Sequence, residues 1–153
     1  MAYSLIEQSS QDLDIFFSDG EKLIHFASAG GRIPDRLLNS DNYNQIVTNA
    51  IAVNSPNFEI EINPNLSEIL GLNNQNLESY LTSFTEMAKK GFYSYDKTKI
   101  GEFDDQNFHL VAKPKSPLTT NTLFNTHKIN VDMIKVEINL PKSFEVFDIT
   151  KFV

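Results

Sequence analysis

Residues 75–95 read QNLESYLTSFTEMAKKGFYSY, a helical pattern that passes through one glycine into a strand pattern. Up to residue 90 the apolar side chains recur every three or four positions, which places them on one face of a helix. They are Leu77, Tyr80, Leu81, Phe84, Met87 and Ala88. Two lysines complement the helix dipole in the last turn, and Gly91 ends the helix. The stretch predicts one main amphipathic helix, at about 75–90, that packs against a sheet.

The chain before this helix predicts a hairpin followed by short elements. In residues 13–27, LDIFF and KLIHF flank an Asp-Gly pair, which is a strong turn signal. Residues 28–34 (SAGGRIP) predict a loop, and short helices are expected from Pro34 to Leu38 and after Asp41. Strict alternation over 58–62 predicts a half-buried strand with both glutamates in water, followed by a short helix that ends at Gly71.

The chain after the helix predicts further strands joined by polar loops. Residues 92–95 and 108–113 have strand character, and an acidic connection separates them. The segment 115–126 is rich in Thr, Asn, Ser and Pro, which is typical of a loop. Val131–Leu140 is the longest strand candidate because apolar and polar residues alternate along it, and Phe144–Phe152 is expected to form a last strand at a sheet edge.

These segments predict a single domain over residues 1–153. They amount to five to seven strands and two to four helices, and hairpin signals outnumber strand–helix–strand units. The expected fold class is α+β, with a largely antiparallel sheet packed against the 75–90 helix and accompanied by short helices.

Composition and charge narrow the classes of function. The chain has 153 residues, no cysteine and a net charge of −7. The lack of cysteine excludes disulfides, thiol nucleophiles and thiolate metal sites. An acidic protein repels nucleic-acid phosphate and attracts basic proteins. Residues 1–11 show no secretory signal and no stretch reaches the ~20 apolar residues of a membrane span, so a cytoplasmic protein without membrane contact is expected.

The sequence contains no motif for catalysis, metal binding or cofactor binding. His25, His109 and His127 lie far apart, without the spacing of metal ligands, and no GxSxG elbow is present. The Ser28–Arg32 loop has two interpretations, a tight structural turn or a cradle of backbone N–H groups for an anion, and the turn is favoured. We therefore expect neither catalytic residues, nor a metal, nor a cofactor.

The densest group of candidate binding residues lies between Tyr93 and Asp105. Carboxylates here offer negative charge on a loop, and tyrosines are enriched at interaction hot spots. The alternatives are that the acids form a solvated turn and that the tyrosines cover the core. Alternation places both tyrosines on one face of the strand, opposite Phe92 and Ser94. The predicted partner-binding residues are Tyr93, Tyr95, Asp96, Glu102, Asp104 and Asp105.

With its tyrosines and carboxylates, the segment from Tyr93 to Asp105 resembles the small acidic bacterial immunity proteins. The likeness extends to size, acidity and the absence of cysteines and catalytic motifs. It implies a cytoplasmic, non-enzymatic protein that neutralises a cognate toxin, for example a basic nuclease, by covering its active site. Two alternatives remain open. One is a small hydrolase in which His109 meets an acid of the 102–105 loop, and the other is a phage or secretion-system assembly subunit with an exposed edge strand near the C-terminus.

Overall fold

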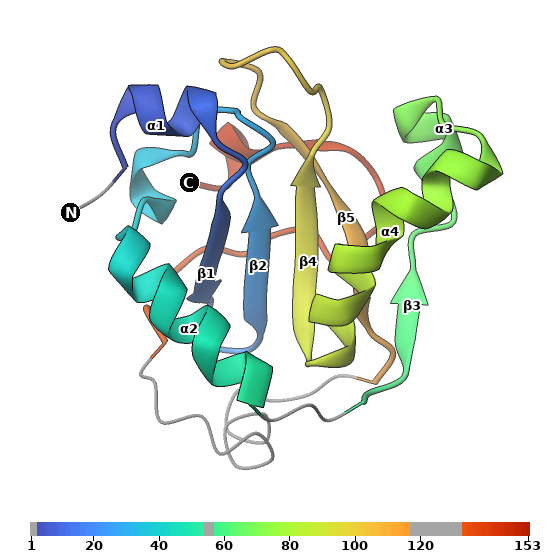
Figure 1. The fold of residues 1–153 in the computed structure, drawn as a ribbon, viewed down its shortest axis with the longest axis horizontal. Helices are drawn as coiled ribbons and strands as arrows, with labels where there is room; N and C mark the ends of the chain where they lie inside the picture. Colours follow the sequence, from blue (N-terminus) through green and yellow to red (C-terminus); the bar gives the residue numbers. More distant parts are fainter. Residues whose placement is uncertain (1–2, 54–56, 117–132) are drawn as a thin grey trace.

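The computed structural model describes residues 3–53, 57–116 and 133–153, in which helices lie against a mixed sheet (Figure 1). In chain order the elements are α1 (Leu5–Ser10), β1 (Asp14–Ser18), β2 (Leu23–Ala27), η1 (Asp35–Leu37), α2 (Asp41–Val53), β3 (Ile60–Ile62), α3 (Leu66–Leu70), α4 (Asn74–Lys89), β4 (Phe92–Lys97), β5 (Asn107–Pro114), β6 (Phe147–Asp148) and η2 (Ile149–Lys151). The two η elements are single 3-10 turns. No helix of the described residues is both long and apolar enough to cross a membrane.

The sheet has the strand order β1-β2-β4-β5-β3. The β2–β4 pair at its centre is parallel, and the other pairings are antiparallel. β3 and β6 both pair with the edge of β5 that faces away from β4. The predicted fold class, α+β with a largely antiparallel sheet against helices, is confirmed.

The predicted hairpin and main helix are present, and local hydrogen bonds explain their ends. In the hairpin turn, Asp19 Oδ1 accepts hydrogen bonds at 2.9 Å from the backbone N–H groups of Glu21 and Lys22. The side chain of Asn73 accepts from the N–H of Asn76 and caps the first turn of α4. The helix stops before Gly91, whose φ of +102° suits glycine.

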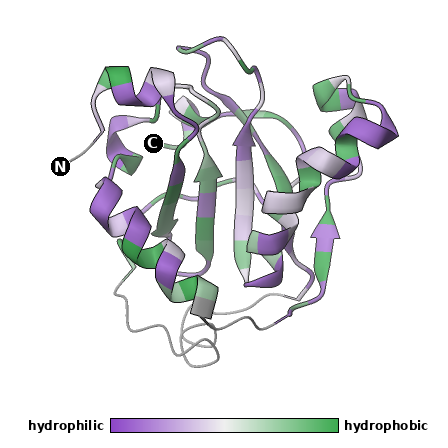
Figure 2. Ribbon diagram, in the orientation of Figure 1, coloured by the Kyte–Doolittle hydropathy of each residue, from purple (hydrophilic) through white to green (hydrophobic). Residues whose placement is uncertain are grey.

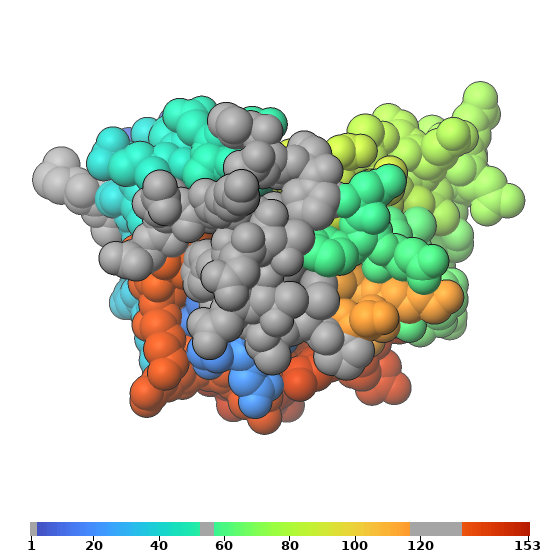
Figure 3. Space-filling model, turned by 90° about the horizontal axis from the view of Figure 1, so that it is seen from below, coloured from blue at the N-terminus to red at the C-terminus, as the bar shows by residue number. Residues whose placement is uncertain are grey.

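Helices cover one face of the sheet and an extended segment covers the other. α2 and α4 both lie on the first face, α2 over β1 and α4 over β4 and β5 (Figure 1). Residues 136–140 lie on the opposite face, which Figure 3 shows below the helices. Along β1 and β2, which are largely green in Figure 2, alternate apolar residues point to the two faces. Phe16 and Leu23 pack under α2, whereas Phe17 and Phe26 pack against the C-terminal segment.

The predicted strand over Val131–Leu140 is wrong in its described part. Residues 133–140 form no strand, and only an isolated bridge joins Lys135 to Ser18. The alternation is correct from residue 136 onward, because Val136, Ile138 and Leu140 are buried on the back of the sheet, whereas Ile134 is exposed. Alternating burial requires only an extended chain against an apolar surface, not hydrogen bonds to a neighbouring strand. Residues 131 and 132, and 117–126 of the predicted 115–126 loop, lie outside the described residues.

The predicted strand over 58–62 is shorter than expected and its sides are mixed. Only Ile60–Ile62 pair with β5, and the side chain of Ile62 is 42% exposed whereas Glu61 is half-buried. β3 is an edge strand, so neither face is fully covered and alternation does not determine burial here. The predicted last strand is present at a sheet edge but contains only Phe147–Asp148.

Side chains close the outer edge of β1. The N–H of Phe16 donates to Asn44 Oδ1 (3.1 Å), and the C=O of Phe16 accepts from Asn39 Nδ2 (2.9 Å). Two residues further along β1, the N–H of Ser18 donates to Ile134 O and the C=O of Ser18 accepts from the N–H of Val136, both at 2.8 Å. Unpaired edge groups are a template for strand addition, and at these positions the protein supplies its own partners.

We expect the substitution Asn44→Ala to lower the free energy of unfolding by about 1–3 kcal/mol, because it leaves the buried N–H of Phe16 without an acceptor. Asn42→Ala is the matched control, since Asn42 is exposed on the same helix. Urea denaturation of both variants measures the difference. Equal stability of the two variants would show that the edge of β1 does not need its asparagine.

Candidate functional site

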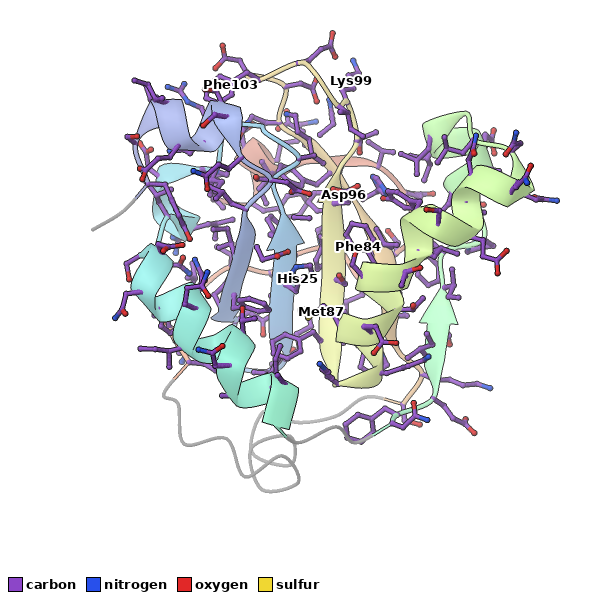
Figure 4. The ribbon with its side chains drawn as sticks, in the orientation of Figure 1. His25, Phe84, Met87, Asp96, Lys99 and Phe103 are labelled. Atoms are coloured by element: carbon purple, nitrogen blue, oxygen red, sulfur yellow. The ribbon has the colours of Figure 1, made fainter. Side chains whose placement is uncertain are left out.

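Two loops that are distant in sequence meet at one end of the sheet. Because β2 and β4 are parallel neighbours, their last residues lie at the same edge, and the loops 28–35 and 98–106 both start there. We call these two segments the loop end. The N–H of Arg32 donates to Phe103 O (2.9 Å), and Gln106 Nε2 donates to Arg32 O (3.2 Å). Figure 4 shows Phe103 and Lys99 beyond the end of the strands.

The 98–106 loop is held in shape by its own hydrogen bonds. The N–H of Thr98 donates to Asn107 O at the base of the loop (2.9 Å). Asp105 Oδ1 accepts from the backbone N–H of Asn107 (2.9 Å), and Asp105 O accepts from Lys97 Nζ. Although burial alone would raise it, the hydrogen bonds from Asn107 hold the pKa of Asp105 below its ordinary value. Asp105 is therefore part of the framework of the loop.

Two of the predicted acids remain available at the surface. Glu102 is exposed, and the side chain of Asp104 is 78% exposed, 3.5 Å from Arg32 Nη1. Ile100, in the same loop, is 66% exposed. The loop end thus presents carboxylates beside an exposed apolar side chain.

The structure places the other three predicted binding residues in the interior. Tyr95 is fully buried and donates to Pro141 O (2.8 Å), and Tyr93 is 9% exposed in the same cluster. They share the back face of β4, opposite Phe92, as the alternation predicted. Asp96 is 3% exposed. A partner has no access to these side chains in the folded protein, so we correct the predicted surface and do not retain them.

In the Ser28–Arg32 loop one backbone N–H group binds a carboxylate, and that carboxylate belongs to the protein itself. Ala29 has a φ of +46° and Gly30 a φ of +71°, and the N–H of Ala29 donates to Asp12 Oδ1 (2.8 Å). The N–H of Gly31 closes a turn onto Ser28 O (2.7 Å). This observation supports the structural-turn interpretation.

A buried polar network lies under α4. Tyr80 OH donates to Asp96 Oδ2 (2.6 Å) and lies 3.1 Å from His109 Nε2. His109 Nδ1 lies 2.9 Å from Thr98 Oγ1. Because the only proton of the Tyr80 hydroxyl goes to Asp96, Nε2 of a neutral His109 donates to Tyr80 and Nδ1 accepts from Thr98. The chain of bonds therefore has one direction, from the base of the 98–106 loop to the carboxylate.

Burial shifts the pKa values of Asp96 and His109 in opposite directions. It raises the pKa of Asp96 to about 7, against the lowering effect of the Tyr80 hydrogen bond. It lowers the pKa of His109 to about 4. Asp12 and Lys97 are the other charged groups that act on Asp96. Sequence reasoning missed this network. The available signal is that Asp96 directly follows a predicted strand and His109 lies within one.

The network does not match the arrangement expected for a hydrolase. His109 contacts Tyr80 and Thr98, not Glu102, Asp104 or Asp105, and it is fully buried. Glu102 and Asp104 lie on the exposed surface, and Asp105 is held by Asn107 within the loop.

A second row of polar side chains crosses β4, β2 and β1. His25 Nδ1 lies 2.7 Å from Ser94 Oγ, and Nε2 lies 2.7 Å from Asp14 Oδ1. The residue types are those of a serine–histidine–aspartate triad. In a catalytic triad, however, the serine is accessible and the aspartate is buried, and here the exposure of the two residues is the opposite. Ser94 is fully buried, whereas the side chain of Asp14 is 60% exposed. A nucleophilic serine must reach the substrate, so we interpret this row as a link between strands. Figure 4 shows His25 between Phe84 and Met87 on the helix-covered face.

Among the described residues, no three His, Cys, Asp or Glu side chains form a group that could hold a metal ion. The chain matches no family model, and neither the curated proteins nor the solved structures contain a match to it.

We expect Gly31→Ala to destabilise the loop end through Lys97. A methyl group on Gly31 would lie 2.6 Å from Lys97 Cε, and Lys97 is fully buried with Nζ bonded to Asp105 O. The free energy of unfolding should fall by about 1–3 kcal/mol, which is typical of overpacking. In a Lys97→Ala background the same change should cost less than about 0.5 kcal/mol, because the obstacle is gone. Additive costs in this double-mutant cycle would contradict the contact.

We expect Asp96 and His109 to contribute opposite pH dependences to stability. The pKa of Asp96 is higher in the folded protein than its ordinary 3.8, so its contribution is lost as the pH rises from about 4 to about 7. The pKa of His109 is lower than its ordinary 6.5, so its contribution is lost as the pH falls from about 6.5 to about 4. Each slope reaches at most about 1.4 kcal/mol per pH unit.

Urea denaturation between pH 4 and 6.5 separates the two contributions. Relative to the wild type, Asp96→Asn should gain stability more steeply with rising pH, and His109→Gln should lose it more steeply. Parallel pH profiles for the wild type and both variants would show that these groups do not titrate as inferred.

Proposed function

We propose that this protein is a non-enzymatic binding protein that neutralises a protein partner through the loop end. In its most specific form, the proposal is an immunity protein that inhibits a cognate bacterial toxin in the cytoplasm, with no cofactor. The observation that carries it is the pair of exposed carboxylates, Glu102 and Asp104, on a loop whose backbone is braced by Lys97 and Asn107.

A braced loop suits recognition because its binding groups need little ordering when the partner arrives. Ile100 supplies an exposed apolar side chain within the same loop, in place of the buried tyrosines. Such a patch, apolar contact beside charge, is the usual composition of a protein interface. The loop end therefore has the components of a recognition surface without requiring rearrangement.

The net charge of −7 favours a basic partner. Negative potential accelerates encounter with a positively charged surface, and repulsion disfavours nucleic acid itself. A toxin that binds nucleic acid has such a basic surface around its active site. Carboxylates placed there occupy the position of phosphate groups and cover the catalytic residues, so a basic nuclease is the partner class that we favour.

The test is the double substitution Glu102→Lys/Asp104→Lys, with Asp105 left in place because it supports the loop. The matched control is Glu68→Lys/Glu78→Lys, which makes the same change in net charge at exposed positions of α3 and α4. Partners are first captured from host lysate at low salt, with the neighbouring gene products co-expressed. The affinity of the purified pair is then measured by calorimetry at several salt concentrations.

We expect the loop-end variant to bind at least about tenfold more weakly than the control, with a smaller dependence on salt. Equal affinities for the two double variants would contradict binding through the loop end. Failure to capture any stoichiometric protein under these conditions would contradict the proposed function as a whole.

A further inference from the structure

A cavity of about 620 Å³ opens beside the loop end, where both loops approach the 3-10 turn η2 near the C-terminus. Its volume is within the range of binding sites for small molecules and for single anchoring side chains with their neighbours. The polar side chains that line it are Arg32, Asp35, Asp104, Gln106 and Thr150. The hydrogen bonds of these side chains determine what the cavity offers to a ligand.

For the two neutral polar side chains of the lining, Gln106 and Thr150, internal hydrogen bonds use the donors and leave acceptors free. Gln106 Nε2 donates to the backbone oxygens of Arg32 (3.2 Å) and Asp105 (3.1 Å), so Gln106 Oε1 is the group without a partner among the described residues. The Thr150 hydroxyl donates to Asp148 Oδ1 (2.6 Å), which leaves its oxygen able to accept. Backbone oxygens thus fix the orientation of Gln106, and the Asp148 carboxylate fixes that of the Thr150 hydroxyl, before any ligand arrives.

The charged groups of the cavity add to this excess of acceptors. Asp35 is exposed, and its carboxylate accepts no hydrogen bond from the described residues. Asp104 is paired with Arg32 at 3.5 Å, and the guanidinium of Arg32 lies 5.9 Å from the centre of the Phe103 ring. The single cation of the lining is therefore paired with one of the two carboxylates, and the cavity keeps two carboxylates against one guanidinium.

We propose that this cavity receives the guanidinium group of an arginine side chain from the protein partner. Guanidinium carries five N–H donors and no acceptor, which complements a lining of two carboxylates, an amide oxygen and a hydroxyl oxygen. The incoming arginine competes with Arg32 for Asp104 and binds Asp35 directly. This inference rests on the proposed function and names the anchor by which the basic partner is held.

The probe is ethylguanidinium chloride, added to the full ¹⁵N-labelled chain and compared with sodium chloride at the same concentration. We expect saturable shifts in NMR spectra at the Gln106 side-chain amide and the Thr150 backbone amide, with a Kd on the order of millimolar. Ethylammonium chloride should bind more weakly, because it has fewer donors. Shifts that never saturate, or that sodium chloride reproduces, would overturn the proposal.

Two variants with opposite expected effects make the assignment specific. Asp35→Asn should weaken binding of the probe by about threefold to fivefold, as expected for loss of one exposed charge pair. Arg32→Gln should strengthen it, because Asp104 is released from its internal partner. Glu68→Gln, exposed on α3, is the control with the same charge change as Asp35→Asn. If Asp35→Asn and its control bind equally, the cavity is not the site.

The probe experiment needs no protein partner, so its outcome is separate from that of the capture experiment. Loss of capture in the Glu102→Lys/Asp104→Lys variant without saturable binding of the probe would leave the proposed function standing and remove the cavity as its anchor. Saturable binding of the probe without capture of a protein would support the guanidinium site and contradict the proposed function as an inhibitor.

Discussion

The parallel pairing of β2 with β4 determines the organisation of this protein. Parallel neighbours cannot be joined by a tight turn, so the chain between them must cross over the sheet. The crossover here contains α2, β3, α3 and α4, and both long helices lie on the same face (Figure 1). The pairing also brings the ends of both strands to one edge. The meeting of the 28–35 and 98–106 loops follows directly from that geometry.

Much of the fold could be predicted from the sequence because local signals decide it. The Asp-Gly turn of the hairpin, the apolar face of the 75–90 helix and the glycine after it each depend on a few neighbouring residues. The pairing partners of each strand depend instead on contacts between distant residues. Periodicity reports that one side of a segment is buried, and it does not report what buries it. Residues 136–140 illustrate this limit, since their alternation is correct but their hydrogen-bonded strand is absent.

The candidate site was predicted in part for the same reason. Glu102 and Asp104 were identified because acids in a loop are solvated by default. Tyr93 and Tyr95 were misplaced because tyrosine suits both an interface and a core, and only the segment on the back of the sheet decides between them. Asp96 was misplaced because a carboxylate is rarely buried. Here the buried carboxylate accepts a hydrogen bond from Tyr80 of α4, which lies 16 residues earlier in the chain. The cavity joins three segments whose proximity no local pattern encodes.

The cover on the back of the sheet has a consequence for how the protein is made. Val136, Ile138 and Leu140 close the apolar surface formed by β1, β2, β4 and β5, and all these strands precede them in the chain. The ribosome therefore releases the strands before it has synthesised the segment that covers them. During that interval the nascent sheet presents a wide apolar surface, which is the kind of surface that chaperones hold. Completion of the core must wait for residues 136–140, which follow all four strands, so the order of synthesis sets when this domain becomes stable.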